Sequence, residues 1–247
     1  MRRPRAGWRW LALAAVLLVL AGLGIWTARG PTPTPRAGPP ASSSLAVLAP
    51  SATVPPLVAA GRCGPARWVQ GVPLGWEASP AGAVSAAAGY AKAMSTAWFV
   101  TDRDHRHRAI ALMATPGQAA DLVASQDRLA AGLLGGPLGS ALGGNSDAGA
   151  LLTTALLGYR VEGFSARSAR VALWAVVVYG AQVGLLPGAA WTTTTIQLAW
   201  AGGDWKLASA VSVPGPDPQP GSGGADGTPA ELVAAARTFR GFTDVPR

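Results

Sequence analysis

Apolar positions follow several patterns along this chain, and the first is an unbroken apolar run near the amino terminus. Residues 11–26 contain neither a charge nor a proline, and Trp8, Trp10 and Thr27 extend the run at its edges. A helix needs about 20 predominantly apolar residues to cross roughly 30 Å of hydrocarbon. The pattern therefore predicts a single transmembrane helix over residues 11–27.

Between Pro80 and Gly135 the apolar residues recur at steps of three and four, which is typical of amphipathic helices. Three helices are predicted, with apolar stripes at Val84, Ala87, Ala91, Met94 and Trp98, at Ile110 and Met113, and at Ala119, Leu122, Val123, Leu129, Ala130 and Leu133. Ser79 suits the N-cap of the first helix. The second and third are expected to begin at the capping boxes Thr101–Asp104 and Thr115–Gln118.

The apolar period then changes to two, which is typical of β-strands. Four strands are predicted, over residues 156–164, 171–179, 191–200 and 205–213. Gly202 and Gly203 favour a two-residue hairpin turn between the last two strands, and this register pairs Trp200 with Trp205. Helices followed by consecutive strands indicate an α+β fold with an antiparallel sheet.

Segments rich in proline, glycine and serine divide the chain, because such compositions favour extended or coil conformations. Beyond the second of them, Thr228–Glu231 forms a capping box for a terminal helix whose apolar face is Leu232, Ala235, Ala236 and Phe239. That face could dock on the domain or on a partner. The predicted organisation is a basic stub (1–10), the transmembrane helix (11–27), a Pro/Ala/Ser-rich linker (28–71), a folded domain (72–213), a linker (214–228) and a C-terminal helix and tail (229–247).

The net charge of +8 is concentrated before the apolar run, where four arginines supply half of the excess. Positive residues remain on the cytoplasmic side, so the sequence predicts a cell-membrane protein with its N-terminus inside and its C-terminal domain outside. The predicted membrane anchors are Arg2, Arg3, Arg5, Trp8, Arg9, Trp10 and Trp26. Because the other half is spread over the rest of the chain, as is ordinary for a protein surface, direct nucleic-acid binding is not expected.

A cleaved secretory signal is the alternative interpretation of the same segment. Its apolar stretch is normally about 7 to 15 residues long and ends at an Ala-x-Ala-like site. Here the run is longer and residues 27–31 make a poor cleavage site. An uncleaved anchor is therefore favoured.

Few residues suggest chemistry. Cys63 is the only cysteine, which excludes an intramolecular disulfide and a cysteine-based zinc site. His105 and His107 are the only histidines and lie in the charged run 102–108, but alternate helix positions do not face each other. A solvated, capped helix start is favoured there over a metal site, an acid-base site or a contact with an acidic partner.

The common nucleotide-binding, zinc-protease and serine-hydrolase motifs are absent from the sequence. We therefore expect no catalytic residue, no cofactor and no metal site, and we predict that the protein is not an enzyme.

Five segments carry a resemblance to a known family: Pro73–Trp76, Pro80–Tyr90, Gly158–Val161, Ala172–Trp174 and Trp191–Lys206. They resemble the extracytoplasmic domain of an actinobacterial single-pass membrane protein family found with integrative conjugative elements. That family looks similar to the inner-membrane scaffolds of type IV secretion. The resemblance implies a nuclear transport factor 2-like domain, cone-like, in which three helices pack on a curved antiparallel sheet.

The leading hypothesis is a bitopic, non-catalytic structural or assembly component of a conjugative, type IV secretion-like DNA-transfer apparatus. Its expected partners are the membrane and other membrane or cell-envelope proteins, including further copies of itself. A small-molecule or lipid-binding module is the alternative, with a cone cavity lined by Tyr90, Trp98, Trp174 and Trp200. An enzyme of the ketosteroid-isomerase type ranks third, because it needs an ionisable group inside the cone and the strands supply almost none.

Overall fold

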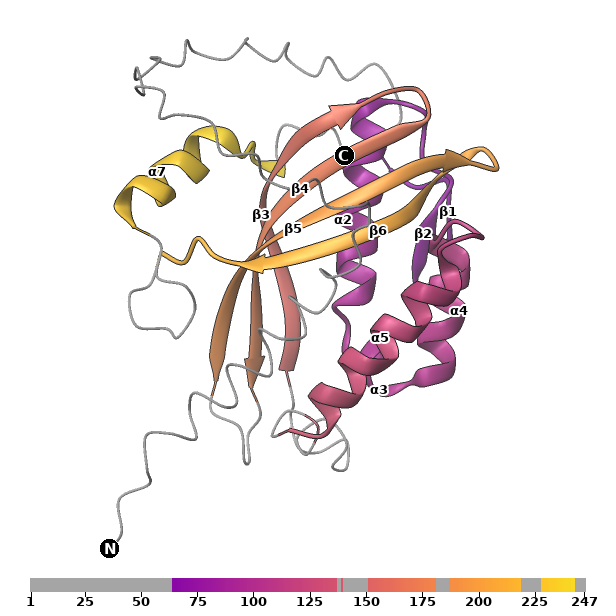
Figure 1. Cartoon of the computed structure of the whole chain (residues 1–247), viewed down its shortest axis with the longest axis horizontal. Coiled ribbons are helices and arrows are strands. Elements are labelled where there is room, and N and C mark those ends of the chain that lie inside the picture. The colour runs from indigo at the N-terminus through magenta and orange to yellow at the C-terminus, as the bar shows by residue number, and fades with distance from the viewer. Residues whose placement is uncertain (1–63, 137–138, 140–150, 181–186, 219–227, 243–247) are drawn as a thin grey trace, which may run out of the picture.

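A four-stranded antiparallel sheet and the long helix that crosses it form the centre of the structure (Figure 1). The computed structural model describes residues 64–136, 139, 151–180, 187–218 and 228–242. Its elements are β1 (Arg67–Val69), β2 (Val72–Leu74), α2 (Pro80–Met94), α3 (Ala97–Thr101), α4 (Arg103–Met113), α5 (Ala119–Leu134), β3 (Leu151–Phe164), β4 (Ser168–Gly180), β5 (Gly188–Ala201), β6 (Asp204–Pro214) and α7 (Pro229–Thr238). The predicted α+β class with an antiparallel sheet is confirmed.

The sheet is a meander in which each strand pairs with the next along the chain, in the order β3-β4-β5-β6. All four predicted strands are present, and each is longer than the apolar alternation indicated. The predicted hairpin register is confirmed, because Trp200 pairs with Trp205 and Leu198 pairs with Leu207 across β5 and β6.

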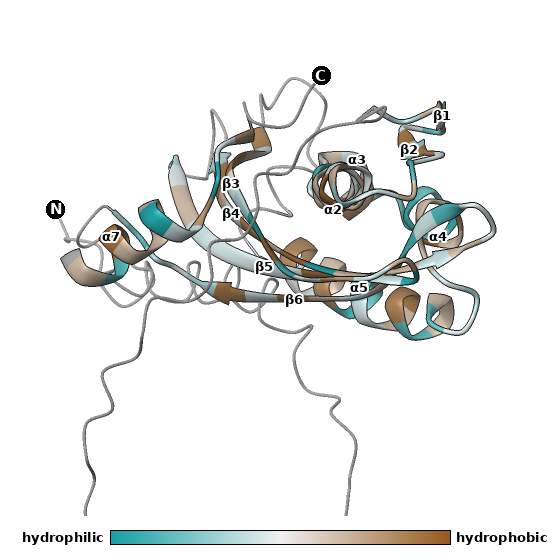
Figure 2. Ribbon diagram, turned by 90° about the horizontal axis from the view of Figure 1, so that it is seen from above, coloured by the Kyte–Doolittle hydropathy of each residue, from teal (hydrophilic) through white to brown (hydrophobic). Residues whose placement is uncertain are grey.

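Helix α2 lies along the concave side of the curved sheet and contacts all four strands (Figure 2). We call this side of the sheet the inner face and the opposite side the outer face. The Ser79 side chain caps α2 by accepting a hydrogen bond from Gly82 N at 3.0 Å. Gly89 permits a close approach, since a Cβ there would lie 2.8 Å from atoms of both Pro73 and Trp76.

The prediction of one helix through Trp98 was wrong, because α2 ends at Met94 and α3 begins at Ala97. The hydroxyls of Ser95 and Thr96 donate to the carbonyls of Ala91 and Ala93, at 2.6 and 2.9 Å. Such side-chain bonds compete with the backbone ladder and favour a helix end.

The two predicted capping boxes in this region were also wrong. Helix α4 is capped by Asp102, whose Oδ1 accepts from His105 N at 2.8 Å, rather than by Thr101. Helix α5 begins at Ala119, and Gln118 makes no side-chain capping bond. The predicted end of α5 at Gly135 is confirmed.

The folded part begins before the predicted boundary at Val72. Strand β1 lies within the range assigned to the linker and pairs with β2 through Arg67–Leu74, Trp68–Pro73 and Val69–Val72. Strands of three residues are too short to show a period in the sequence.

At the C-terminal end, the capping box of Thr228 and Glu231 is confirmed. The predicted membrane anchors, the apolar run 11–26 and Cys63 lie outside the described residues. Within the described part of the chain, no helix combines the length and apolar character needed to span a bilayer.

Candidate functional site

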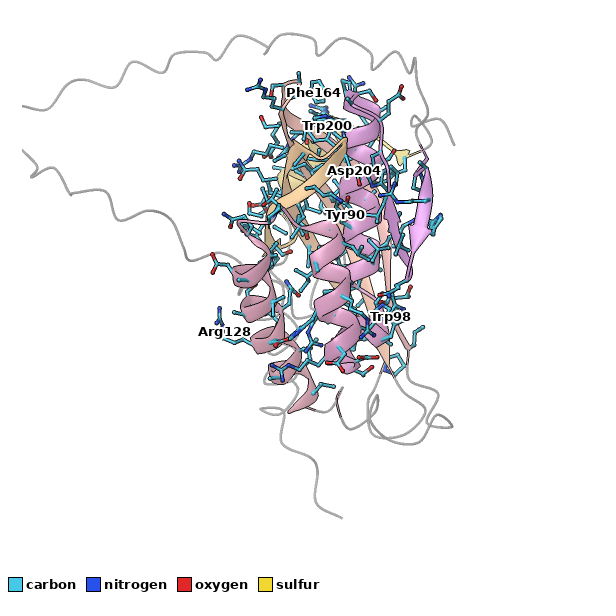
Figure 3. All side chains as sticks on the ribbon, turned by 90° about the vertical axis from the view of Figure 1, so that its right-hand side faces the viewer. Tyr90, Trp98, Arg128, Phe164, Trp200 and Asp204 are labelled. Atoms are coloured by element: carbon cyan, nitrogen blue, oxygen red, sulfur yellow. The ribbon has the colours of Figure 1, made fainter. Side chains whose placement is uncertain are left out.

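The structure does not bring the four predicted lining residues together. Tyr90 is fully buried between α2 and the sheet, Trp200 lies toward one end of the domain, and Trp98 lies toward the other (Figure 3). Trp174 is on the outer face, because its strand neighbours Leu173 and Ala175 are buried against the inner side and successive side chains alternate. A common lining by all four residues is therefore not formed.

Tyr90 and Trp205 form the centre of a buried polar cluster. The Tyr90 hydroxyl donates to the main-chain carbonyl of Trp205 at 2.6 Å, and Trp205 Nε1 donates to the Glu77 carbonyl at 2.8 Å. Burial, together with the nearby Asp204 carboxylate, raises the pKa of Tyr90 above its usual range. The phenol consequently stays protonated and acts as a donor.

Asp204 and Lys206 together join three segments of the chain, and the Asp204 side chain is only 5% exposed. Its Oδ1 accepts from the main-chain nitrogen of Trp76 at 2.9 Å, and its Oδ2 accepts from Lys206 Nζ at 3.2 Å. The same Lys206 ammonium donates to the Leu112 carbonyl near the end of α4, at 2.8 Å. Asp204 and Lys206 therefore fasten the β5–β6 hairpin to the segment before α2 and to α4.

This cluster unites three of the segments that carry the family resemblance: Pro73–Trp76, Pro80–Tyr90 and Trp191–Lys206. The two side-chain polar groups at the centre of this cluster, the Tyr90 hydroxyl and the Asp204 carboxylate, already bond main-chain or lysine partners. These bonds fix α2, α4 and the segment between β2 and α2 against the sheet.

A second cluster involves the charged run at the start of α4. Arg106 is 4% exposed, and its Nη1 donates to the carbonyls of Phe99 and Val100 at 2.9 and 3.0 Å. Asp127 on α5 lies 2.8 Å from Arg106 Nη2 and 2.8 Å from His107 Nε2. The predicted solvated helix start is thus partly an internal network that joins α3, α4 and α5.

We expect Asp127→Asn to lower the free energy of unfolding by about 1 to 2 kcal/mol, because Arg106 and His107 lose a charged acceptor. Burial raises the pKa of Asp127, but the hydrogen bonds and charges of His107 and Arg106 outweigh it and hold that pKa below its ordinary value. The stabilisation is therefore complete above about pH 4 and is lost as the pH falls through the lowered pKa. Urea unfolding of both proteins at several pH values tests this.

Asp121→Asn is the matched control for this prediction, since Asp121 is an exposed carboxylate on the same helix. A difference between wild type and Asp127→Asn that persists unchanged at pH 2 would contradict the electrostatic explanation.

An aromatic cluster covers part of the outer face. The Trp174 ring lies 5.6 Å from the Trp191 ring and 6.1 Å from the Phe239 ring, measured between centroids. Trp174 Nε1 donates to the Pro216 carbonyl at 3.2 Å. The guanidinium of Arg160 lies over the Phe239 ring at 4.8 Å. Part of the predicted linker after β6, and the chain after α7, therefore pack on this face.

The residues after α7 also form an isolated antiparallel β-bridge with the β3 edge. Tyr159 N donates to Arg240 O at 2.9 Å, and Arg240 N donates to Tyr159 O at 2.8 Å. Phe242 reaches the Tyr159 ring at 5.3 Å between centroids. Sequence reasoning left the docking of this region open, and the pattern Phe239-x-x-Phe242 after the helix was the available signal.

The predicted apolar face of α7 is confirmed only in part. Ala235 is buried, Leu232 and Phe239 are half-buried, and Ala236 is exposed. Among the described residues, no three His, Cys, Asp or Glu side chains are grouped so that they could hold a metal ion.

Comparisons with known proteins place this domain in a family. A solved structure, the intermembrane space region of the chloroplast protein ARC6, is similar at 14% identity and a TM-score of 0.32, over 52% of this chain and 92% of that one. No curated protein matches the chain. Residues 29–225 match a family described as a domain of unknown function, DUF8175. Since this match spans most of the sequence, the chain belongs to the DUF8175 family.

Proposed function

We propose that this protein is a bitopic membrane protein whose outer domain is a non-catalytic assembly component of a conjugative, type IV secretion-like DNA-transfer apparatus. In this proposal residues 11–27 form the transmembrane helix and the basic stub stays in the cytoplasm. The folded domain is of the nuclear transport factor 2-like, cone-like type. It contacts other proteins at or near the outer surface of the same membrane.

The observation that carries the proposal is the use of the interior polar groups. Tyr90, Asp204 and Trp205 each bond main-chain atoms of another segment, so these groups serve to hold the domain rigid. A binding pocket needs polar groups directed at the ligand. This favours a rigid interaction module over the alternative, a small-molecule or lipid-binding module.

Exposed apolar side chains supply a surface for such contacts. On β6, Val211 and Val213 are 37% and 51% exposed, whereas the alternating Ala210 and Ser212 are buried. Both valines therefore lie on the outer face beside each other on an edge strand of the sheet. Apolar side chains grouped on an edge strand are a common feature of surfaces that bind other proteins.

Fractionation of bacteria that express the tagged full chain tests the proposal. We expect the protein to remain with the membranes after an alkaline wash, and its outer domain to be cut by protease added to spheroplasts. Cross-linking and pull-down should recover cell-envelope proteins, and Val211→Asp with Val213→Asp should reduce that recovery.

Leu134→Asp is the control for the interaction surface, because Leu134 is 37% exposed but lies at the end of α5. A protein that is soluble and recovers no envelope protein would overturn the proposal.

A further inference from the structure

We propose that the segment Thr228–Phe242 is an exchangeable latch and that the β3 edge which receives it also receives the same segment of a second copy of this chain. Two copies would then be joined by reciprocal exchange. The inference deepens the proposed assembly function and rests on it only for the biological role of the dimer.

The seat for the latch lies on both sides of the β3 edge. On the outer face, Phe239 fills the space beside Trp174 and under the Arg160 guanidinium. At the edge itself, Arg240 and Tyr159 exchange two backbone hydrogen bonds. Phe242 then contacts the Tyr159 ring, which belongs to the inner core. The contact is a single β-bridge, the shortest form of strand pairing, with a side-chain anchor on each side of the bonded pair.

Gly158 shapes this seat. It pairs with Trp174 across β3 and β4, directly after a register irregularity in β3. A Cβ at Gly158 would lie 3.0 Å from Arg240 O and 3.0 Å from the Phe239 Cβ. The missing side chain therefore leaves room on the outer face that the latch occupies, and any larger residue would obstruct the seat.

The latch is separable from the domain that carries its seat. The family match ends at residue 225, before the latch begins, whereas Gly158, Arg160 and Trp174 all lie within the match. Helix α7 has its own capping box, and its Val233 is 48% exposed. Most of the contacts described for the latch come from the four residues that follow the helix, Phe239–Phe242.

A stretch of nine residues separates the domain from the latch. Residues 219–227 join Pro218 to Thr228 and include Gly221, Gly223, Gly224 and Gly227. A fully extended stretch of this length reaches about 30 Å. Because every copy carries the same seat and the same latch, exchange with a second copy reuses the contacts that form within one chain.

A complementation experiment with the full chain in detergent tests the exchange. Gly158→Val obstructs the seat but leaves the latch intact and unseated. The double variant Phe239→Ala, Phe242→Ala lacks the anchors of its own latch. Its seat is intact and can accept the latch of another copy. We expect each variant alone to be monomeric by light scattering, whereas an equimolar mixture forms a heterodimer in which differently tagged chains co-purify. An excess of synthetic peptide Thr228–Phe242 should dissociate that heterodimer.

Arg160→Glu is the second seat variant, to be used if Gly158→Val fails to fold by circular dichroism. It removes the cation over Phe239 at a partly exposed position. Folded variants that stay monomeric on mixing would overturn the exchange. So would a homodimer of the latch variant that forms as readily as the heterodimer. Both results concern purified protein and are independent of the fractionation that tests the assembly function.

Discussion

Trp205→Ala is expected to lower the free energy of unfolding by about 3 to 5 kcal/mol, which is a large share of the roughly 5 to 15 kcal/mol available to a typical domain. Trp205 is fully buried and contacts the Trp200 and Phe164 rings at 5.2 and 5.8 Å between centroids. Truncation would leave a cavity and would free the Glu77 carbonyl that its indole nitrogen bonds. Urea unfolding followed by circular dichroism measures the loss.

Trp200→Ala is the matched control, because Trp200 is the cross-strand partner of Trp205 but is only half-buried. We expect it to cost about 0.5 to 1.5 kcal/mol through loss of the aromatic pair. Equal losses from the two substitutions would show that Trp205 is not at the centre of the core.

The second large effect is expected for Asp204→Ala, which should lower the free energy of unfolding by about 3 kcal/mol or more. The substitution leaves the Lys206 ammonium without its carboxylate and the Trp76 N–H without its acceptor. Because Lys206 is mostly buried, water can compensate only in part. Thermal and urea unfolding of the variant would both report the change.

A double-mutant cycle with Lys206→Met separates the charge pair from the bond to Trp76. Replacing both members of a buried ion pair is commonly much less costly than removing one. We therefore expect Asp204→Ala with Lys206→Met to be more stable than the sum of the single effects predicts. Strict additivity would contradict the proposed coupling.

The strands could be predicted because the residues that define each strand and its turn are close together in the sequence. Alternating apolar residues define each strand, and Gly202 with Gly203 specifies the turn that sets the β5–β6 register. The existence of the helices was predictable for the same reason, from stripes at steps of three and four. The ends of the helices were harder to predict. The apolar stripe continues past Met94, but side-chain hydrogen bonds from Ser95 and Thr96 favour the end of α2 there.

The placement of the aromatic residues could not be predicted from the pattern. In β4 both faces are apolar, so the alternation does not say which face Trp174 joins. Trp174 lies on the outer face because Phe239, from a segment much later in the chain, packs against it there. Likewise, the charged run around Arg106 has the pattern of a solvated surface. The sequence does not show that Asp127, on another helix, lies beside Arg106.

The buried polar cluster around Tyr90 and Trp205 also sets an order of events during synthesis. The bonds from Trp76 to Asp204 and from Trp205 to Glu77 each join residues 128 positions apart, and the bond from Tyr90 to Trp205 spans 115. Contacts of such sequence separation form slowly, because a long loop must close before they are gained. The segment from β1 to α5 therefore has no completed core until the β5–β6 hairpin has left the ribosome, and translation of nearly the whole domain precedes its folding.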